Sequence, residues 1–180
     1  KPFCFLMDAS MLGVGVGFDT KGAGEIIVKG VDKKRETTYE IPDTREGWVE
    51  SLRLLLESYF HHLGKVEFDY SEIRPAGAPI SGFGGVASGH EPLEELHDEI
   101  RQVLELNSGE PITITTIVDI MNLIGKCVVA GNVRRTAEIV FGDHNSEEYL
   151  DLKNYKVNKH RETYGWTSNN SIFAELGMDY

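Results

Sequence analysis

A glycine-rich segment over residues 79–89 is the first candidate for binding chemistry in this sequence. It contains four glycines and two serines between Pro79 and Gly89. Because glycine lacks a Cβ atom, successive backbone N–H groups in such a segment can turn toward an anion such as a phosphate. The segment has neither the dinucleotide-binding fingerprint nor the lysine of a Walker sequence. Two alternatives therefore stay open, a phosphate-binding loop and a glycine-rich surface turn.

A pair of adjacent arginines, Arg134 and Arg135, is the second candidate. The pair follows Gly131 and Asn132, which are typical residues for the end of a helix. Two guanidinium groups can donate forked hydrogen bonds to a phosphate or a carboxylate. They can equally form surface ion pairs with some of the 29 acidic residues of the chain. The sequence favours neither alternative.

The histidines and cysteines point to structural roles. His61 and His62 stand near the end of a predicted helix, where imidazoles complement the helix dipole, and adjacent residues do not share a helix face as metal ligands would. Cys4 lies between two phenylalanines and Cys127 lies in an apolar helical stretch, surroundings typical of inert thiols. No nucleophile with a base and an orienting partner is recognisable.

Alternating helical and strand patterns must position these candidates, and they predict an α/β protein. Residues 13–18 alternate glycine with apolar side chains, which indicates a strand with one bare face that backbone or a ligand can approach. Residues 19–41 suggest a small β hairpin or insertion, with the charged segment 32–36 separating two short strands. Apolar periodicity and capping residues predict helices over 43–64, 92–106 and 115–129, and strands are expected over 66–70, 136–141 and 167–173, with a long loop over 73–89.

Length and composition limit the function classes. A chain of 180 residues is one domain or a large piece of a bigger one. Its net charge of −11 argues against non-specific binding of DNA or of an anionic membrane. No run of 18 apolar residues is present, and the charge at Asp8 comes too early for a signal peptide, so we expect a cytoplasmic protein. Two cysteines are too few for a disulfide framework, which fits a reducing compartment.

Several longer strings in the chain resemble one enzyme family in content and in order. In the first half these are DASMLGVGVGF at 8–18, PDTREGW at 42–48, and the segment from SEIRPAG at 71–77 to ASG at 87–89. In the second half they are NLIGK at 122–126, VAGNVRR at 129–135 and WTSNNS at 166–171. Together they resemble the adenosylcobalamin-dependent (class II) ribonucleoside-triphosphate reductases, and the resemblance covers nearly the whole chain.

This resemblance implies a fold and a chemistry. The family fold is a ten-stranded α/β barrel, in which a cysteine thiyl radical generated from adenosylcobalamin attacks the ribose of a ribonucleotide. That chemistry also needs a redox pair of cysteines with a nearby Asn and Glu. Cys4 and Cys127 lie in no such context, so we expect the radical and redox cysteines outside residues 1–180 and assign no catalytic residue to the chain. By the same resemblance the chain is an internal segment of the reductase barrel, 19–41 is a small insertion, and the cobalamin contacts are unknown.

The resemblance also implies binding residues and partners. The expected partners are a ribonucleotide substrate, a deoxynucleotide effector and the remainder of the reductase chain, with no membrane and no direct nucleic-acid binding. Residues 159–170 resemble the loop that links effector identity to the choice of substrate base, which brings Trp166 near that base. Non-catalytic nucleotide-binding regulation and a ligand-free remnant are the alternatives. The predicted substrate-binding residues are Gly13, Gly15, Gly17, Ser168 and Asn169, and the predicted effector-binding residues are Arg74, Ile80, Ser81, Gly84, Gly85, Arg134 and Arg135.

Overall fold

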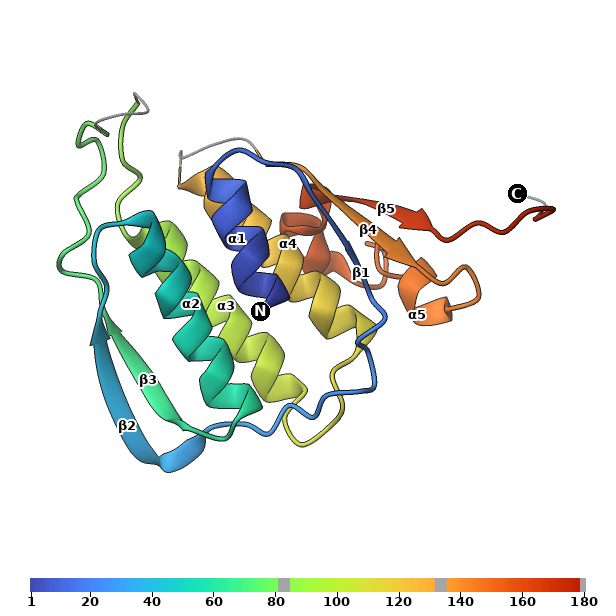
Figure 1. Ribbon diagram of the computed structural model, residues 1–180, viewed down its shortest axis with the longest axis horizontal. Coiled ribbons are helices and arrows are strands. Elements are labelled where there is room, and N and C mark those ends of the chain that lie inside the picture. Colours follow the sequence, from blue (N-terminus) through green and yellow to red (C-terminus); the bar gives the residue numbers. More distant parts are fainter. Residues whose placement is uncertain (81–84, 132–135, 179–180) are drawn as a thin grey trace.

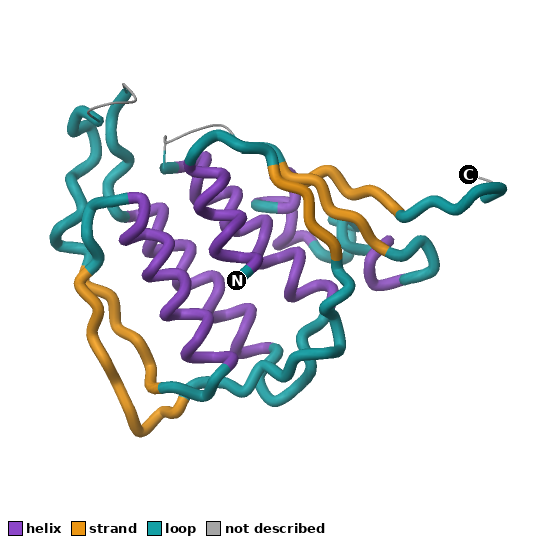
Figure 2. The backbone as a smooth tube through the Cα atoms, in the orientation of Figure 1, coloured by secondary structure: helices purple, strands orange, loops and turns teal. Residues whose placement is uncertain are grey.

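The computed structural model describes residues 1–80, 85–131 and 136–178, and it consists of a helical layer with strands at two of its sides (Figure 1). Figure 2 shows the two groups of strands separated by the helices. The α-helices are α1 (Pro2–Met11), α2 (Arg45–Phe60), α3 (Glu91–Leu106), α4 (Ile114–Ala130) and α5 (Glu147–Leu150), and the short 3-10 helices are η1 (Lys159–Thr163) and η2 (Gly165–Thr167). The strands are β1 (Val16–Asp19), β2 (Asp32–Glu40), β3 (Gly64–Asp69), β4 (Glu138–Gly142) and β5 (Ser168–Ile172).

Helix α4 is the centre of the fold, and both α1 and α3 pack against it. Its N-terminus begins where Thr113 accepts a hydrogen bond from the backbone N–H of Thr116 at 3.0 Å, a capping contact that satisfies a free helix donor. Most of the helix is apolar on all sides, and Ile120 and Ile124 are fully buried. Burying a side chain of this size contributes about 1.5–3 kcal/mol. The same core includes Leu6, Leu52, Leu55, Leu93, Leu96 and Ile100 from the other helices.

Strands β1, β4 and β5 form a parallel sheet with β4 in the middle. Val16 pairs with Glu138, and Glu138 pairs with Ser168, so the three strands are in continuous register. Along β4 the buried residues Glu138 and Val140 alternate with the partly exposed Ile139. Because successive side chains of a strand point to opposite faces, one face of this sheet packs on α4 and the other is open.

Strands β2 and β3 form a separate parallel pair joined through α2. The predicted β hairpin over 19–41 is therefore wrong. Residues 25–28 form no strand, although Ile27 makes an isolated bridge with Pro111, and the charged segment expected to separate two strands lies inside β2. Nearly all of β2 is exposed, so its charged side chains remain in water and the strand carries no alternating apolar pattern to recognise.

The other predicted helices and strands differ from the observed ones mainly at their ends, whereas α1, α5, η1 and η2 were not predicted. The expected strand over 13–18 begins only at Val16, because Gly13 adopts φ 82° and its N–H bonds the carbonyl of Ser10 at 2.8 Å, which closes α1. Helix α1 itself lacked a sequence prediction, and its mostly apolar residues show no clear polar face. Helix α2 ends at Phe60, four residues before the expected Gly64, which begins β3. In the described part of the chain, no helix is long and apolar enough to cross a membrane.

Candidate functional site

The open face of the β1–β4–β5 sheet brings together two of the predicted substrate residues. Gly17 pairs in register with Ile139, and Ile139 pairs with Asn169, so these three residues form one row across the sheet. Gly17 and Asn169 are both exposed. A Cβ atom on Gly17 would lie 3.3 Å from Cγ2 of Ile139, so the glycine leaves room directly beside the isoleucine. The bare face expected from the glycine alternation is thus present at Gly17.

The next row of the same face adds charged and aromatic groups. Asp19, Phe141 and Ser171 are in register there. The ring of Phe141 stacks on Phe173, with ring centroids 5.9 Å apart, and the ammonium group of Lys21 lies 4.8 Å from the centroid of the Phe173 ring. A face with an amide, a cation and two aromatic rings can contact a polar heterocycle through both stacking and hydrogen bonds.

The other predicted substrate residues lie elsewhere. Ser168 is 2% exposed, and its hydroxyl donates to Oδ1 of Asn170 at 3.0 Å, on the sheet face that packs on α4. It is on the opposite face from Asn169 because the two residues are neighbours in β5. Gly15 is exposed just before β1, and a Cβ there would lie 3.5 Å from the carbonyl oxygen of Ala137. Gly13 belongs to the turn that ends α1.

The predicted effector loop follows the carboxyl end of β3 and folds back on itself. The N–H of Ile80 donates to the carbonyl of Gly85 at 3.1 Å, and Pro79 bridges with Val86. Gly85 adopts φ 105°, a backbone conformation that favours glycine. Ser81 and Gly84, two of the predicted effector residues, lie outside the described residues.

Arg74 stands at the base of this loop and already has an acidic partner. Its Nε donates to Asp43, and its Nη1 donates to the carbonyl of Pro79 at 3.3 Å. The guanidinium group therefore connects the loop to the residues just before α2. Because Arg74 is partly exposed, a phosphate could approach its remaining N–H groups.

The arginine pair at 134 and 135 lies outside the described residues, but the structure describes the residues on either side of 132–135. Gly131 closes α4, and its N–H bonds the carbonyl of Cys127 at 2.8 Å. On the other side, the hydroxyl of Thr136 donates to the hydroxyl oxygen of Ser10 at 2.9 Å. The described residues on either side, Gly131 and Thr136, therefore lie at the end of α4 and beside Ser10 of α1. In the sequence, residues 132–135 precede the amino end of β4, whereas the effector loop follows the carboxyl end of β3.

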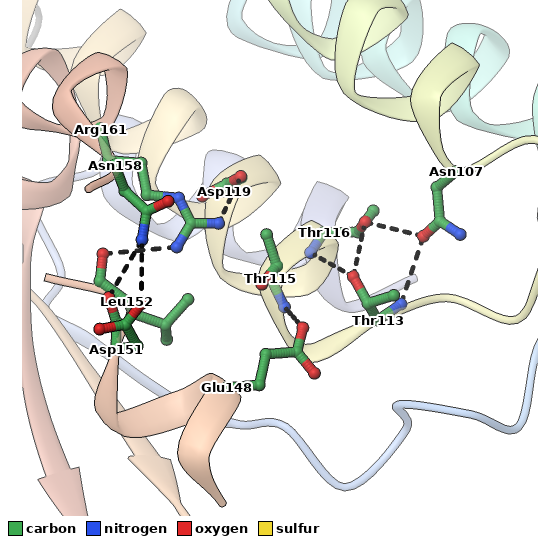
Figure 3. A network of polar contacts seen from close by, with 10 residues as sticks. All are labelled: Asn107, Thr113, Thr115, Thr116, Asp119, Glu148, Asp151, Leu152, Asn158 and Arg161. Carbon is green, nitrogen blue, oxygen red and sulfur yellow. Dashed lines mark hydrogen bonds and ion pairs between the residues drawn. The ribbon is translucent and has the colours of Figure 1, made fainter. Parts of the chain in front are cut away.

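Three buried ionisable side chains were missed by the sequence reasoning: Asp119 lies in α4, and Arg161 and Glu138 contact that helix. Arg161 of η1 forms an ion pair with Asp119 at 3.2 Å, and Figure 3 shows this pair within a wider polar network. Burial raises the pKa of Asp119 to about 6, against the opposing effect of Arg161. Burial likewise raises the pKa of Glu138 to about 8. The signal that could have revealed Asp119 is a single acid inside the apolar stripe of its helix.

A cavity of about 860 Å³ opens beside this network, between α3 and α4 on one side and α5 and η1 on the other. Its lining includes the carboxylates Glu99, Glu110, Asp119, Glu148 and Asp151, together with Arg161. None of the predicted substrate or effector residues lines it. Among the described residues, no group of three His, Cys, Asp or Glu side chains is arranged to hold a metal ion.

Comparison with known proteins gives one consistent result. The family model for the "B12-dependent ribonucleotide reductase, insertion domain" matches residues 20–104. The chain is 60% identical to a probable adenosylcobalamin-dependent ribonucleoside-triphosphate reductase of Dictyostelium discoideum, over 100% of this chain and 26% of that protein. It is 59% identical to the adenosylcobalamin-dependent ribonucleoside-triphosphate reductase of Euglena gracilis, over 99% of this chain and 25% of that protein.

The solved structures agree with the sequence comparison. The crystal structure of a B12-dependent (class II) ribonucleotide reductase superposes with a TM-score of 0.85 and 31% identity, covering 98% of this chain and 29% of that chain. This match confirms the predicted α/β fold class as part of a reductase fold. The chain spans about a quarter of the length of the curated relatives that it matches. The matched insertion-domain range starts close to the expected insertion at 19–41 and continues into α3, so the expected bounds stay a prediction.

Proposed function

We propose, since the chain belongs by sequence and fold to the adenosylcobalamin-dependent (class II) ribonucleotide reductases, that it forms the nucleotide-binding part of such an enzyme. The complete enzyme would convert a ribonucleoside triphosphate to the deoxyribonucleotide, as the names of the relatives state for them. In this proposal the chain supplies a substrate-facing sheet surface and an effector loop, and the remainder of the reductase supplies the reacting cysteines.

The observation that carries the proposal is the row of Gly17, Ile139 and Asn169 on the open sheet face. The glycine exposes backbone, the isoleucine gives an apolar contact, and the amide of Asn169 can both donate and accept hydrogen bonds. An amide of this kind can recognise the edge of a base or a ribose hydroxyl, whereas an apolar side chain cannot. We assign the substrate to this face.

We assign the effector to the loop that begins at Arg74. The N–H of Ile80 bonds the carbonyl of Gly85 at 3.1 Å and Gly85 adopts φ 105°, so these two described residues of the loop lie side by side. Arg74 at the base of the loop offers charge-assisted donors to a phosphate, and Asp43 holds the guanidinium group in place. The predicted residues Ser81, Gly84, Arg134 and Arg135 stay part of this proposal.

Adenosylcobalamin would supply the radical-forming chemistry of the complete enzyme. The cavity beside α3 and α4 does not fit this cofactor, because five carboxylates line it and the nucleotide tail of cobalamin carries a negatively charged phosphate. We therefore assign no cobalamin contact to the described residues.

The chain alone should reduce no ribonucleotide. Cys127 is fully buried, and burial raises the pKa of its thiol far above the usual range. Burial also raises the pKa of Cys4. A raised pKa disfavours the thiolate form that disulfide exchange requires, so neither thiol is suited to that reaction. Turnover by the purified 180 residues with adenosylcobalamin and a dithiol would contradict this expectation.

The substrate assignment is tested by Asn169→Ala in the complete reductase. Losing the amide should raise KM for the ribonucleotide about tenfold while the affinity for the effector is unchanged. Asn145→Ala is the matched control, because Asn145 is an exposed asparagine in the turn before α5. An unchanged KM in Asn169→Ala would contradict the assignment of the substrate to this face.

The effector assignment is tested by Arg74→Ala in the same enzyme. Removing a charge-assisted contact should weaken effector binding roughly tenfold to a hundredfold, while the unstimulated rate changes little. Arg53→Ala is the control, because Arg53 pairs with Glu50 and Glu57 on the surface of α2. Unchanged effector affinity in Arg74→Ala would favour the alternative that the loop is a glycine-rich surface turn. A large loss of the unstimulated rate would instead show that Arg74 acts in substrate binding.

A further inference from the structure

The cavity between α3, α4, α5 and η1 contains more acidic groups than the described chain neutralises. Five carboxylates line it, and among the described lining residues Arg161 is the only lysine or arginine. That arginine is already paired, because its Nη2 lies 3.2 Å from Oδ2 of Asp119, and Nη1 donates to the carbonyl of Leu152 at 3.3 Å. Figure 3 shows these contacts at the α5 and η1 side of the cavity. The cavity wall therefore keeps an excess of acidic groups.

Three of the lining acids, Glu110, Glu148 and Asp151, form no ion pair with a basic side chain in the described part of the chain. Two of them have neutral partners. The backbone N–H of Thr115 donates to Glu148 at 2.8 Å, and Nδ2 of Asn154 donates to Asp151 at 2.8 Å. All three acids are exposed. A concave wall with one sign of charge attracts the opposite charge, so this wall favours lysine or arginine side chains.

Apolar side chains accompany these acids. Val103, Leu106 and Leu123 line the cavity, and Leu106 at the end of α3 is 90% exposed. On the elements that border the cavity, Leu150 of α5 and Val157 just before η1 are 60% and 72% exposed. Exposed apolar side chains that gather around a polar hollow are typical of a surface that another segment covers.

One buried donor in the lining has no partner. Arg161 is 6% exposed, and its Nε has no hydrogen-bond partner among the described residues. A buried donor that lacks an acceptor has a cost in free energy, which an occupant with a carbonyl oxygen could remove. A metal ion or a polyamine brings no acceptor, whereas a peptide brings backbone carbonyls together with cationic and apolar side chains. The lining therefore fits a basic amphipathic peptide segment better than a small cation.

The complete reductase can supply such a segment from its own chain. This chain spans about a quarter of the length of the curated relatives that it matches, so most of their length lies outside the matched part. A segment of the same polypeptide is present at a high effective concentration, so it occupies a weak site more readily than a separate molecule does. The net charge of −11 on these 180 residues also attracts basic parts of the remainder.

We propose that this cavity is the docking site for a basic amphipathic segment of the remainder of the reductase chain. Its lysine or arginine side chains would contact Glu110, Glu148 and Asp151, and its apolar side chains would cover Leu106. The inference goes beyond the proposed function and takes from it only that the chain is part of a complete reductase.

The test measures how fast each carboxyl group of the complete reductase reacts with a water-soluble carbodiimide and glycinamide, with the labelled peptides followed by mass spectrometry. Glu110, Glu148 and Asp151 should react at least about tenfold more slowly than Glu147, and the difference should vanish in urea. Glu147 is the matched control, because it is exposed in the same helix as Glu148 and does not line the cavity. Reaction rates in the folded enzyme equal to that of Glu147 would overturn the proposal.

A charge reversal tests whether the docked segment is basic. Glu148→Lys should repel the segment and raise the labelling rates of Glu110 and Asp151 toward that of an exposed acid, whereas Glu147→Lys should leave both protected. Glu148→Gln, which keeps an acceptor for the N–H of Thr115, should act in the same direction more weakly. Unchanged protection in both Glu148 variants would overturn the proposal, and the labelling of the wild type tests it even where a variant does not fold.

Two further measurements separate the docked segment from other occupants. Protection that decreases on dilution of the enzyme would identify a second copy of the protein, and protection that is lost after exhaustive dialysis would identify a small cation. Either result would overturn the proposal. Protection that survives both treatments in an enzyme that reduces no ribonucleotide would contradict the proposed function alone, so the two failures are distinguishable.

Discussion

Gly125 of α4 lies directly against the carboxyl group of Glu138 of β4. A Cβ atom on Gly125 would be 2.2 Å from Oε1 of Glu138 and 3.1 Å from Cβ of Thr167. The helix can approach the sheet this closely because position 125 has no side chain. The other carboxyl oxygen of Glu138 accepts a hydrogen bond from Nδ2 of Asn122 at 3.1 Å, while Oε1 has no partner among the described residues.

Substituting Gly125 with alanine should therefore destabilise the protein. Alanine favours a helix over glycine by about 1 kcal/mol, but the added methyl group cannot fit without moving Glu138 or the strand. Overpacking of this kind typically costs about 1–3 kcal/mol, so we expect a net loss in the free energy of unfolding measured by urea denaturation. Gly22→Ala is the control, because a Cβ there meets no atom within 4 Å. A Gly125→Ala variant more stable than wild type would show that α4 and β4 are less closely packed.

Replacing Glu138 with glutamine should change how stability depends on pH. Burial raises the pKa of Glu138 to about 8, above its unfolded value of 4.5, so the folded protein favours the protonated carboxyl. Its stabilising contribution is complete below pH 4.5 and is lost as the pH rises through 8. Glutamine stays neutral, so Glu138→Gln should become more stable than wild type by up to a few kcal/mol as the pH increases over this range. Chemical denaturation at pH 5 and pH 8 measures the difference.

One result would contradict this prediction for Glu138→Gln. A stability difference between wild type and Glu138→Gln that is constant from pH 5 to pH 8 would mean that the carboxyl binds protons equally in the folded and the unfolded chain. Glu67→Gln is a suitable control, because Glu67 is a partly exposed acid with Lys65 as its partner, and the hydrogen bond from Lys65 lowers its pKa.

The regular elements that could be predicted from sequence are those with local signals. Thr44 caps α2 by accepting the N–H of Gly47 at 3.0 Å, and the apolar residues of this helix recur at helical spacing. Strand β2 could not be predicted in this way, because its pairing with β3 depends on the crossover through α2 and its side chains are exposed. Helix α1 is mostly apolar, and such a segment has no period that distinguishes a buried helix from a strand.

The candidate site was predictable only in part for the same reason. The bare strand at Gly17 is visible as an alternation in the sequence, and the family resemblance places Asn169 near the substrate. That both belong to one row follows from strand register, which the sequence does not reveal. The pairing of Asp119 with Arg161 joins residues 42 positions apart, a contact that only the tertiary fold creates.

Cys4 and Cys127 should be dispensable for the chemistry of the complete enzyme. Cys127 is buried in the core, Cys4 is partly buried against it, and burial raises the pKa of both thiols. Replacing both with alanine should leave turnover of the complete reductase within a few-fold of wild type, as measured with adenosylcobalamin and a dithiol. A loss of several orders of magnitude would show that one of them belongs to the redox pair.

His97 of α3 is a buried histidine whose two ring nitrogens both have partners. Nε2 lies 2.9 Å from Oγ of Ser51, and Nδ1 lies 2.7 Å from the hydroxyl of Tyr70. Because the hydroxyl of Ser51 donates to the carbonyl of Trp48 at 2.7 Å, its oxygen must accept from Nε2–H. Burial lowers the pKa of His97 to about 3, so the imidazole is neutral near pH 7, and Nδ1 accepts from the hydroxyl of Tyr70. The ring thereby connects α2, α3 and the residue that follows β3.

The stability of the protein should fall in acid because of this histidine. Burial lowers the pKa of His97 to about 3, below its unfolded value of 6.5. Its contribution to stability is complete above pH 6.5 and is lost as the pH falls toward 3, since the unfolded chain binds a proton that the folded protein excludes. His97→Phe keeps a ring that can stack on Phe68 and removes this titration. The variant should be about 1–3 kcal/mol less stable at pH 7, because the hydroxyls of Ser51 and Tyr70 lose their partner.

As the pH decreases from 7 to 4.5, the difference between wild type and His97→Phe should shrink, because only the wild type loses the contribution of a neutral imidazole. Urea denaturation at several pH values in this range measures the difference. His61→Phe is the control, since His61 is an exposed histidine at the end of α2. A His97→Phe difference that stays constant with pH would show that His97 titrates alike in the folded and unfolded chain, and would contradict the neutral, hydrogen-bonded imidazole.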